Sequence, residues 1–340
     1  MSVSKVLITG GAGFVGSELV RQAVAMGWKI TVVDNLRNGR REYLDGLPAD
    51  QVELVVADIR DIPQMRTLMS GVDIVYHLAC LCVRHSIHSP QENHDVNATG
   101  TIQLLGLAKE LGIKRFVYTS SAEVYGSACT GAVTEENALK PTNPYGAAKL
   151  AAESYAQAYF ICYRVPTVVL RLFNVYGPRC HQEGDCGEVI PKFLLRSMAG
   201  RCMVVFGDGN QTRDFNFVED SARAILAAGL RDEAIGQIIN VGSGIETSVN
   251  HLARTIKEVV GKQEVPITHD NPRPGDIARM YADGTKARKL LGYSPKVTLR
   301  EGLLRLKEWY SERSEFLEDL LATEVIHNWE LDQIQSVSKR

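Results

Sequence analysis

The chain has 340 residues, of which 45% are hydrophobic and 23% are charged. These proportions are typical of a globular protein of one or two domains with a full-sized core, and they exclude a disordered chain. The formal net charge of -2 excludes a general attraction to nucleic acid or to an anionic membrane, because each requires a basic excess.

The first residues, MSVSKVLITGG, lead directly into an apolar strand without a basic leader, an apolar export segment or a cleavage site. No stretch approaches the roughly 18 consecutive apolar residues that span a membrane. The seven cysteines are an odd number in a large chain, and they lack the CxxC pairing of a zinc site. We therefore expect a cytoplasmic protein with no metal site and with neither a membrane nor nucleic acid as a partner.

Strands and helices are predicted to alternate through the first 125 residues. Short, almost continuous apolar runs predict strands at residues 5–9, 29–34, 52–57, 74–78 and 115–120. Helical patterns lie between them at residues 16–26, 62–69 and 97–111. This alternation predicts an α/β fold with a Rossmann-type, doubly wound parallel sheet.

A long helix is predicted over residues 145–163, because it follows one proline and ends before another, and a buried strand is predicted over 167–173. Beyond about residue 175, clusters of Gly, Pro and charged residues separate shorter elements, which indicates a smaller C-terminal substrate-binding lobe rich in loops. We expect three parts: a dinucleotide-binding domain over residues 1–175 with returning segments from about 210–245, a substrate lobe mainly over 176–310, and a peripheral helix or tail over 311–340.

Three glycines, Gly10, Gly13 and Gly16, lie at the turn from the first strand into the first helix. Residues without a Cβ let the backbone approach a pyrophosphate, whose charge is met by the amides at the helix N-terminus. The second strand ends at Asp34, whose carboxylate can accept both ribose hydroxyls of NAD and repel the 2′-phosphate of NADP. Asp34 favours NAD, although three arginines that follow could meet a phosphate: Arg37, Arg40 and Arg41.

Tyr145 and Lys149 lie four residues apart near the start of the predicted long helix, so their side chains project from one face. The strand over 115–120 delivers Ser120 and Ser121 beyond its carboxyl end. A neighbouring ammonium favours a phenolate, as does a positively charged nicotinamide. We therefore expect the pKa of Tyr145 to be drawn from about 10 toward working pH, which makes the phenol a general base.

The chain resembles the extended short-chain dehydrogenase/reductases, and within them the NAD-dependent nucleotide-sugar epimerase/dehydratase family. The resemblance covers about residues 5–310 and rests on TGGAGFVG, Asp34-Asn35, His77-Leu78-Ala79, Asn97, SSAEVYG, the segment 145–149, LRLFNVYGPR and FGDGNQTRDF. It implies NAD as the cofactor. The cofactor-binding residues that it implies are Gly10, Gly13, Phe14, Val15, Asp34, Asn35, Asp58, Ile59, Leu78, Ala79, Asn97, Ser120, Tyr145, Lys149 and Leu172.

Asp58 follows the third predicted strand, where its carboxylate could accept a hydrogen bond from the adenine amino group. A role as the N-cap of the next helix is the other interpretation of Asp58.

The resemblance implies that Ser121 and Tyr145 share a hydrogen bond to the substrate hydroxyl and that Lys149 also holds the nicotinamide ribose. Tyr145 would remove the proton of the sugar 4-hydroxyl while the C4 hydride passes to NAD, which gives a 4-keto sugar. The fate of this ketone separates the activities of the family. A regulatory or scaffolding protein that binds NAD but has lost catalytic activity is disfavoured, because Tyr145 and Lys149 are both present.

Ala122-Glu123 stands where the dehydratases of the family carry an Asp-Glu pair. Ala122 cannot protonate a departing 6-hydroxyl, which favours a 4-epimerase. The decarboxylases of the family place a Glu at the position of Glu123, so a dehydratase or a UDP-glucuronate decarboxylase is the alternative. A structural role for Glu123 in a buried hydrogen-bond network is the third interpretation.

The resemblance also implies a substrate site with amide and guanidinium donors for a diphosphate and with an apolar slot for a flat base, most often uridine. Arg84 either binds the carboxylate of a uronic acid or faces solvent. The expected substrate-binding residues are Arg84, Ser121, Glu123, Tyr145, Asn174, Arg179, Val189, Val204, Phe206, Arg213 and Arg273.

A homodimer is expected through the helices over 97–111 and 145–163, because relatives in the family pair these helices into a four-helix bundle. The outer residues of the second helix are small or apolar, among them Ala151, Ala152, Tyr155, Ala158 and Tyr159. Without a partner these residues would leave an exposed apolar patch.

Overall fold

The computed structural model describes residues 5–127, 131–184, 186–273, 275–313, 317–330 and 332. Within these residues the central sheet has seven parallel strands in the order β11-β6-β5-β4-β1-β2-β3. Because the winding reverses between β1 and β4, the carboxyl ends of these strands border the crevice in which doubly wound sheets bind ligands. The strands are β1 Lys5–Thr9, β2 Lys29–Asp34, β3 Val52–Val56, β4 Ile74–His77, β5 Arg115–Ser121, β6 Thr167–Leu172 and β11 Ile238–Val241.

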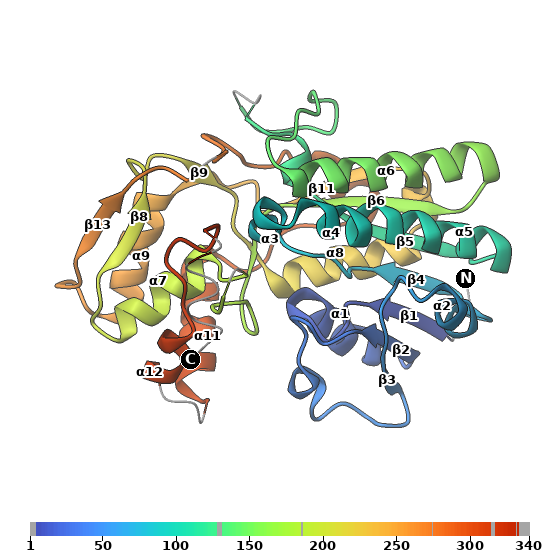
Figure 1. The fold of residues 1–340 in the computed structure, drawn as a ribbon, viewed down its shortest axis with the longest axis horizontal. Coiled ribbons are helices and arrows are strands. Elements are labelled where there is room, and N and C mark those ends of the chain that lie inside the picture. Colours follow the sequence, from blue (N-terminus) through green and yellow to red (C-terminus); the bar gives the residue numbers. More distant parts are fainter. Residues whose placement is uncertain are drawn as a thin grey trace.

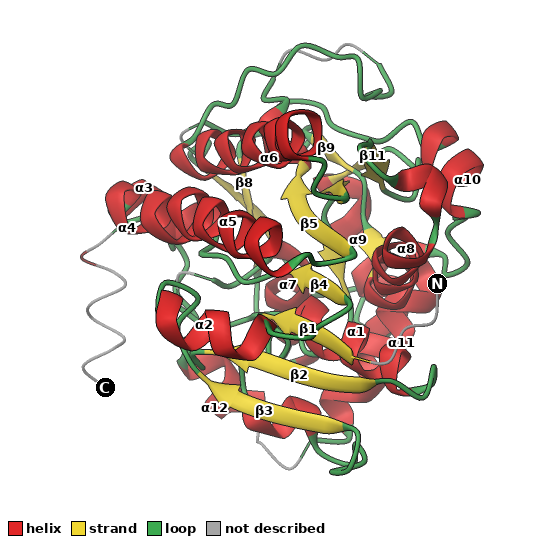
Figure 2. Cartoon of the chain, turned by 90° about the vertical axis from the view of Figure 1, so that its right-hand side faces the viewer, coloured by secondary structure: helices red, strands yellow, loops and turns green. Residues whose placement is uncertain are grey.

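Helices cover both faces of the sheet (Figure 2). On one face lie α1 Phe14–Val24, α8 Val218–Leu230 and α10 Thr285–Leu291. On the other face lie α2 Ile62–Met69, α5 Thr101–Leu111 and α6 Pro144–Tyr163. The predicted Rossmann-type fold is therefore confirmed.

The predicted helix over 97–111 differs in its first turns, where the backbone forms a π-helical turn over Asp95–Gly100 before α5. π-helical turns are local departures from α-helical hydrogen bonding and often accompany functional sites. The apolar periodicity of a sequence does not reveal them.

A second lobe stands beside the sheet (Figure 1). Its core is formed by α7 Val189–Met198, β8 Met203–Phe206, α9 Val249–Val260, α11 Leu299–Ser311 and α12 Leu317–Ala322, and β13 Ile267–Asp270 pairs in parallel with β8. Short strands connect the lobes: β7 Val175–Tyr176 pairs with β10 Asn216–Phe217, and β9 Thr212–Arg213 pairs with β12 Thr247–Ser248. The remaining helices, α3 Val83–His88 and α4 Pro90–His94, follow β4.

The chain returns to the sheet domain more than once after residue 175. Besides α8 and β11, which lie in the expected returning segment, α10 packs into the core of the sheet with Leu291 and Tyr293. The segment 317–330 also differs from the expected peripheral tail, because Leu320, Leu321 and Val325 are buried in the structure.

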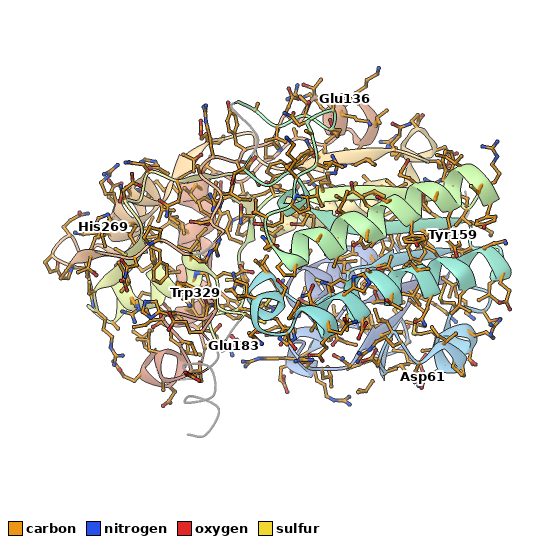
Figure 3. All side chains as sticks on the ribbon, turned by 45° about the horizontal axis from the view of Figure 1, so that its top comes forward. Asp61, Glu136, Tyr159, Glu183, His269 and Trp329 are labelled. Atoms are coloured by element: carbon orange, nitrogen blue, oxygen red, sulfur yellow. The ribbon has the colours of Figure 1, made fainter. Side chains whose placement is uncertain are left out.

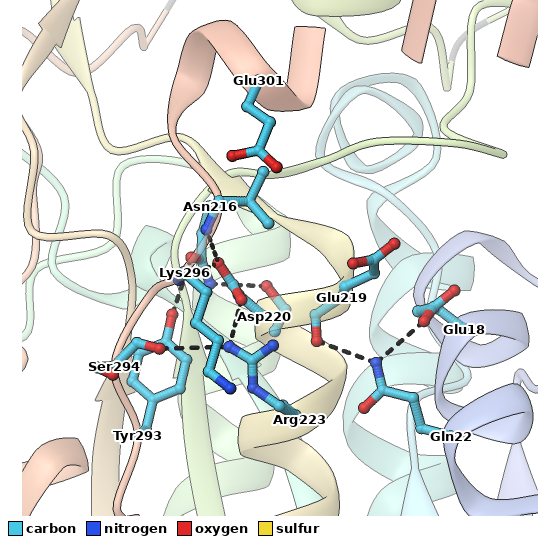
Figure 4. A network of polar contacts seen from close by, with 12 residues as sticks. Glu18, Gln22, Asn216, Glu219, Asp220, Arg223, Tyr293, Ser294, Lys296 and Glu301 are labelled. Carbon is cyan, nitrogen blue, oxygen red and sulfur yellow. Dashed lines mark hydrogen bonds and ion pairs between the residues drawn. The ribbon is translucent and has the colours of Figure 1, made fainter. Parts of the chain in front are cut away.

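A polar network fixes the returning chain to α8 (Figure 4). The fully buried carboxylate of Asp220 accepts hydrogen bonds from the backbone amides of Lys296 at 2.8 Å and Val297 at 3.0 Å, and it pairs with Arg223. Gln22 of α1 donates to the carbonyl oxygen of Glu219 at 3.0 Å. These contacts hold α1, α8 and the segment before α11 together.

In the described part of the chain, no helix combines the length and the apolar character that crossing a membrane requires.

Candidate active site

A cavity of about 480 Å³ lies between the carboxyl ends of the sheet strands and the second lobe. This volume is within the range of small-molecule sites, roughly 300–1,000 Å³. Every predicted site residue lines this cavity except Asn97 and Arg179.

The glycine turn leaves room for a ligand at the N-terminus of α1. Gly10 has a φ of +69°, and a Cβ on it would lie 2.8 Å from the amide nitrogen of Ala79. A Cβ on Gly16 would lie 2.0 Å from the carbonyl oxygen of Gly10. Gly13, the N-cap of α1, lines the cavity with no acidic residue in the helical turn that follows. This cradle fits a pyrophosphate, as the N-terminus of a helix attracts an anion.

Asp34 ends β2 at the rim of the same cavity. Its carboxylate accepts hydrogen bonds from the amides of Ala12 at 3.1 Å and Leu36 at 2.9 Å. Burial raises the pKa of this carboxyl group, and the two amide hydrogen bonds oppose that rise. Arg37 pairs with Glu92, and Arg40 pairs with Glu183 at 3.3 Å, so both of these arginines already have carboxylate partners.

Asp58 is not the N-cap of α2, because Asp61 takes that position and accepts from the amide of Gln64 at 3.1 Å. The Asp58 carboxylate instead lines the cavity and pairs with Arg60 at 2.7 Å. Hydrogen bonding from Arg60 lowers the pKa of Asp58 to about 2. The Asp58 side chain is therefore a charged acceptor at the cavity wall.

The N-terminus of α6 positions the Tyr145 and Lys149 pair. Asn143 caps the helix by accepting from the amide of Gly146 at 2.8 Å, and Pro144 occupies the first turn. Lys149 is 2% exposed, and its Nζ atom donates to the carbonyl oxygen of Thr119 at 2.8 Å. The same Nζ atom lies 5.7 Å from the centroid of the Tyr145 ring.

The pKa of Tyr145 departs from the sequence-based expectation. Burial raises it well above its usual value, whereas a hydrogen bond with Ser121 lowers it. Burial also lowers the pKa of Lys149. The expected lowering of the tyrosine pKa is thus not found in the chain itself, because the loss of hydration outweighs the hydrogen bond with Ser121.

Glu123 lines the cavity just after β5, and its Oε2 atom accepts a hydrogen bond from Asn143 at 2.7 Å. Its backbone amide donates to the Oγ atom of Ser121 at 3.2 Å. Ala122, between them, is buried. The carboxylate of Glu123 therefore braces the residue that caps α6.

A buried ion pair fixes α6 against the sheet. Arg171 of β6 donates to Glu153 of α6 through Nη2 at 2.5 Å and Nε at 3.1 Å, and both side chains are 2% exposed. Arg171 also donates to the hydroxyl of Tyr125 at 2.7 Å. Glu153 lies one helical turn beyond Lys149, so the pair sets the rotation of the helix that carries Tyr145. Arg171 is a charged residue within the apolar run that ends at Leu172, and this was the sequence signal that could have indicated a buried ion pair.

Two predicted phosphate ligands share one carboxylate at the cavity wall. Arg213 and Arg273 each donate to Oδ1 of Asp276 at 2.6 Å. Burial lowers the pKa of Arg213. Asn174, also predicted, lines the cavity with them.

Arg84 lies in the cavity wall and does not simply face solvent. Its guanidinium donates to the carbonyl oxygen of Cys186 at 2.6 Å. Nearby Glu188 is partly buried, and loss of hydration raises its pKa to about 7, while the charge of Arg84 opposes the rise.

The two residues outside the cavity have structural partners. Arg179 donates to Glu18 of α1 at 2.6 Å, which draws it away from the expected substrate site. Asn97 lies in the π-helical turn, where its amide group accepts from the backbone of Leu81 at 2.8 Å and donates back to it at 3.0 Å. Asn97 thereby shapes the loop after β4, whose residues line the cavity.

Sequence reasoning missed one wall of the cavity. The further lining residues include Glu188, Lys192, Arg196, Glu324, Ile326, Asn328 and Trp329. Four of these belong to the segment expected to be peripheral. Trp329 within that charged segment was the signal that could have indicated that the segment packs against the rest of the protein.

Comparisons with known proteins agree with this geometry. A family model described as GDP-mannose 4,6 dehydratase matches residues 7–306. UDP-glucose 4-epimerase of Mycolicibacterium smegmatis is 37% identical over 315 residues, covering 92% of this chain and all of the relative. UDP-glucuronic acid decarboxylase 1 of Xenopus tropicalis is 34% identical over 318 residues, covering 92% of this chain and 73% of the relative.

A solved structure is similar over nearly the whole chain. UDP-glucuronic acid 4-epimerase of Bacillus cereus, in complex with UDP-glucuronic acid and NAD, has a TM-score of 0.84 and 30% identity, covering 91% of this chain and 99% of that structure. Together with the parallel sheet and the glycine cradle, these matches show that the chain belongs to the GDP-mannose 4,6-dehydratase family of the extended short-chain dehydrogenase/reductases.

Proposed function

We propose that this chain is a nucleotide-sugar 4-epimerase that acts through a transient 4-keto sugar, with a UDP-sugar as substrate. The observation that carries the proposal is Ala122. It follows Ser121 directly and is buried beside the cavity, so no acid stands there to protonate a departing 6-hydroxyl. The arrangement suits oxidation at C4 and return of the hydride to the opposite face.

NAD is the cofactor, and the cradle at α1 together with Asp34 fits it. When bound, it supplies the hydride acceptor for the sugar C4. The neighbouring Tyr145, Ser121 and Lys149 all line the same cavity.

The residues of the chain handle the proton in this mechanism. Tyr145 Oη takes the proton of the sugar 4-hydroxyl, and Ser121 shares the hydrogen bond to that hydroxyl. Because burial raises the pKa of Tyr145, the phenolate needs positive charge beside it when the substrate is present. Lys149 and the cofactor's positive ring supply this charge. Tyr145 returns the proton when the hydride is delivered.

A second candidate function is a dehydratase or UDP-glucuronate decarboxylase, and Glu123 favours it. Its carboxylate lines the cavity just after β5. In the epimerase proposal this carboxylate has the positioning role that its hydrogen bond to Asn143 supports.

The experiment that tests the proposal is incubation of the purified protein with a panel of UDP-, dTDP- and GDP-sugars. Conversion without a change of mass is the result expected of an epimerase. A product lighter by one water would identify a dehydratase, and a product lighter by carbon dioxide would identify a decarboxylase; either would replace the proposal.

Asp34→Ala should weaken NAD binding and relax the discrimination against NADP, since the carboxylate that repels a 2′-phosphate is removed. Asp34→Asn is the milder comparison, because it removes the charge but keeps the size of the side chain and an acceptor for one of the two amides; Ala12 and Leu36 donate to different carboxylate oxygens. Binding titrations with both cofactors measure the effect. An unchanged preference in both variants would remove Asp34 from the ribose site.

We also propose a homodimer through α5 and α6. On the side of α6 turned away from the sheet, Ile161 is 63% exposed, and Tyr155 beside it is 45% exposed, whereas Ala152 is buried in the sheet core. Ile161→Glu should therefore yield monomers by light scattering at micromolar concentration, while Ile245→Glu, at a site 60% exposed outside both helices, should leave the dimer intact. A monomeric wild type would refute the dimer.

A further inference from the structure

Residues 324–329 form a wall of the cavity although the matched family model ends at residue 306. Glu324, Ile326, Asn328 and Trp329 all line it. The chain segment that carries them follows α12 and runs back along α7 toward the sheet domain (Figure 1). Figure 3 places Trp329 near the boundary between the two lobes.

This segment is anchored to α7 and to the residues just before it. Arg196 Nε donates to both carboxylate oxygens of Glu324 at 2.9 Å. Lys192 Nζ donates to the carbonyl oxygen of Val325 at 2.6 Å, and Asn328 donates to that of Gly187 at 2.9 Å. The side chains of Val325 and Asn328 are buried. Backbone carbonyls and buried side chains thus hold the wall in a defined place.

The wall ends in a group of three aromatic rings. The Trp329 indole lies 4.8 Å from the Phe206 ring and 5.4 Å from the His327 ring, centroid to centroid. His327 is held by Asp270 at 2.8 Å. The Trp329 and Phe206 rings meet at an interplanar angle of 79°, and both line the cavity and are only partly buried. A flat, apolar ligand group can therefore stack on one of these rings and contact the edge of the other.

Cationic groups line the same cavity as these aromatic rings and Tyr145. Arg213 interacts electrostatically with both Glu123 and Arg273. Lys192 is partly buried, and loss of hydration together with the charges of Arg84, Arg196 and Arg273 lowers its pKa to about 7. The cavity therefore brings together Tyr145, several cationic side chains and a group of aromatic rings. A sugar, a diphosphate and a nucleobase each find a matching kind of side chain there.

We propose that Trp329 is a specificity-determining residue that contacts the nucleobase of the substrate beside Phe206. The inference rests on the proposed function, because it assumes a nucleoside diphosphate in this cavity. A base stacked on an aromatic side chain gains binding energy from the shared π face and from exclusion of water. Loss of the indole is expected to weaken nucleotide binding about 5- to 150-fold.

The experiment first titrates UDP, dTDP and GDP into the full chain by calorimetry. The nucleotide that binds most tightly is then titrated into the Trp329→Ala and Trp329→Phe variants. Trp329→Ala should weaken binding by the factor above, and Trp329→Phe should recover most of the affinity. Inorganic pyrophosphate, which lacks a base, should bind wild type and Trp329→Ala equally. Trp309→Phe is the matched control, because Trp309 packs on Tyr310 and Arg313 and does not line the cavity.

Tryptophan fluorescence supplies an independent reading. The chain has three tryptophans, of which Trp28 is buried in the sheet core and Trp329 lines the cavity. The nucleotide should quench the wild type and Trp309→Phe but not Trp329→Phe.

Three outcomes count against the proposals. Equal nucleotide affinity in Trp329→Ala and wild type overturns the inference and leaves the proposed function standing. A parallel loss of pyrophosphate binding also overturns it, because Trp329 would then act only through the structure of the wall. Failure of the wild type to bind any of the three nucleotides overturns the proposed function itself.

Discussion

Tyr145→Phe is expected to lower kcat by about 10²- to 10⁴-fold while the protein still binds NAD. The change removes only the phenolic oxygen that takes the proton of the sugar 4-hydroxyl. The ring, the cap at Asn143 and the hydrogen bond of Lys149 to Thr119 do not depend on that oxygen. Turnover of the substrate found in the nucleotide-sugar panel and a binding titration with NAD measure the two properties separately.

Tyr163→Phe is the matched control, because it removes the same atom from an exposed position at the other end of α6. It should retain wild-type turnover. Activity of Tyr145→Phe within tenfold of wild type would show that another group accepts the proton.

Glu123→Gln separates the two candidate functions. In a 4-epimerase the carboxylate only braces Asn143, and the amide oxygen of Gln can accept the same hydrogen bond, so most activity should remain. In a dehydratase or decarboxylase Glu123 serves in the chemistry, and the same change should cost at least about 10²-fold. Initial rates together with the absorbance of reduced nicotinamide report on both cases.

Glu123→Ala sharpens this comparison, because it removes the acceptor for Asn143 as well as the charge. A positioning role predicts that Ala lowers activity more than Gln does. Equal, large losses in both variants, with reduced cofactor accumulating, would contradict the epimerase proposal.

The sheet could be predicted from the sequence because its strands are buried on both faces. β4 and β5 read as nearly continuous apolar runs, and the structure places them within a residue of the expected limits. The ion-pair partners of charged residues inside such runs could not be predicted. Arg115 of β5 is fully buried, and the carboxylate that pairs with it at 2.6 Å belongs to Asp232, far along the chain. Long-range partners of this kind leave no local pattern.

The cofactor side of the site follows from motifs with a fixed backbone geometry, such as Gly10 at positive φ. The substrate side depends on how loops of the second lobe fold. Arg179 belongs to a recognised motif but turns to Glu18, whereas Trp329 belongs to none and lines the cavity. The pKa of Tyr145 could not be read from its spacing to Lys149, because burial is a property of the whole fold.

The ion pair between Glu153 and Arg171 also constrains how the chain can vary. Tyr145, Lys149 and Glu153 follow one another at intervals of four residues on α6. An insertion or deletion of one residue between Tyr145 and Glu153 would rotate one end of the helix by about 100° relative to the other. Either the tyrosine would leave the cavity or the guanidinium of Arg171 would be buried without its carboxylate partner, and the second outcome costs about 3–5 kcal/mol. Changes in the length of α6 are therefore tolerated only beyond Glu153, where the helix runs on toward its end at Tyr163.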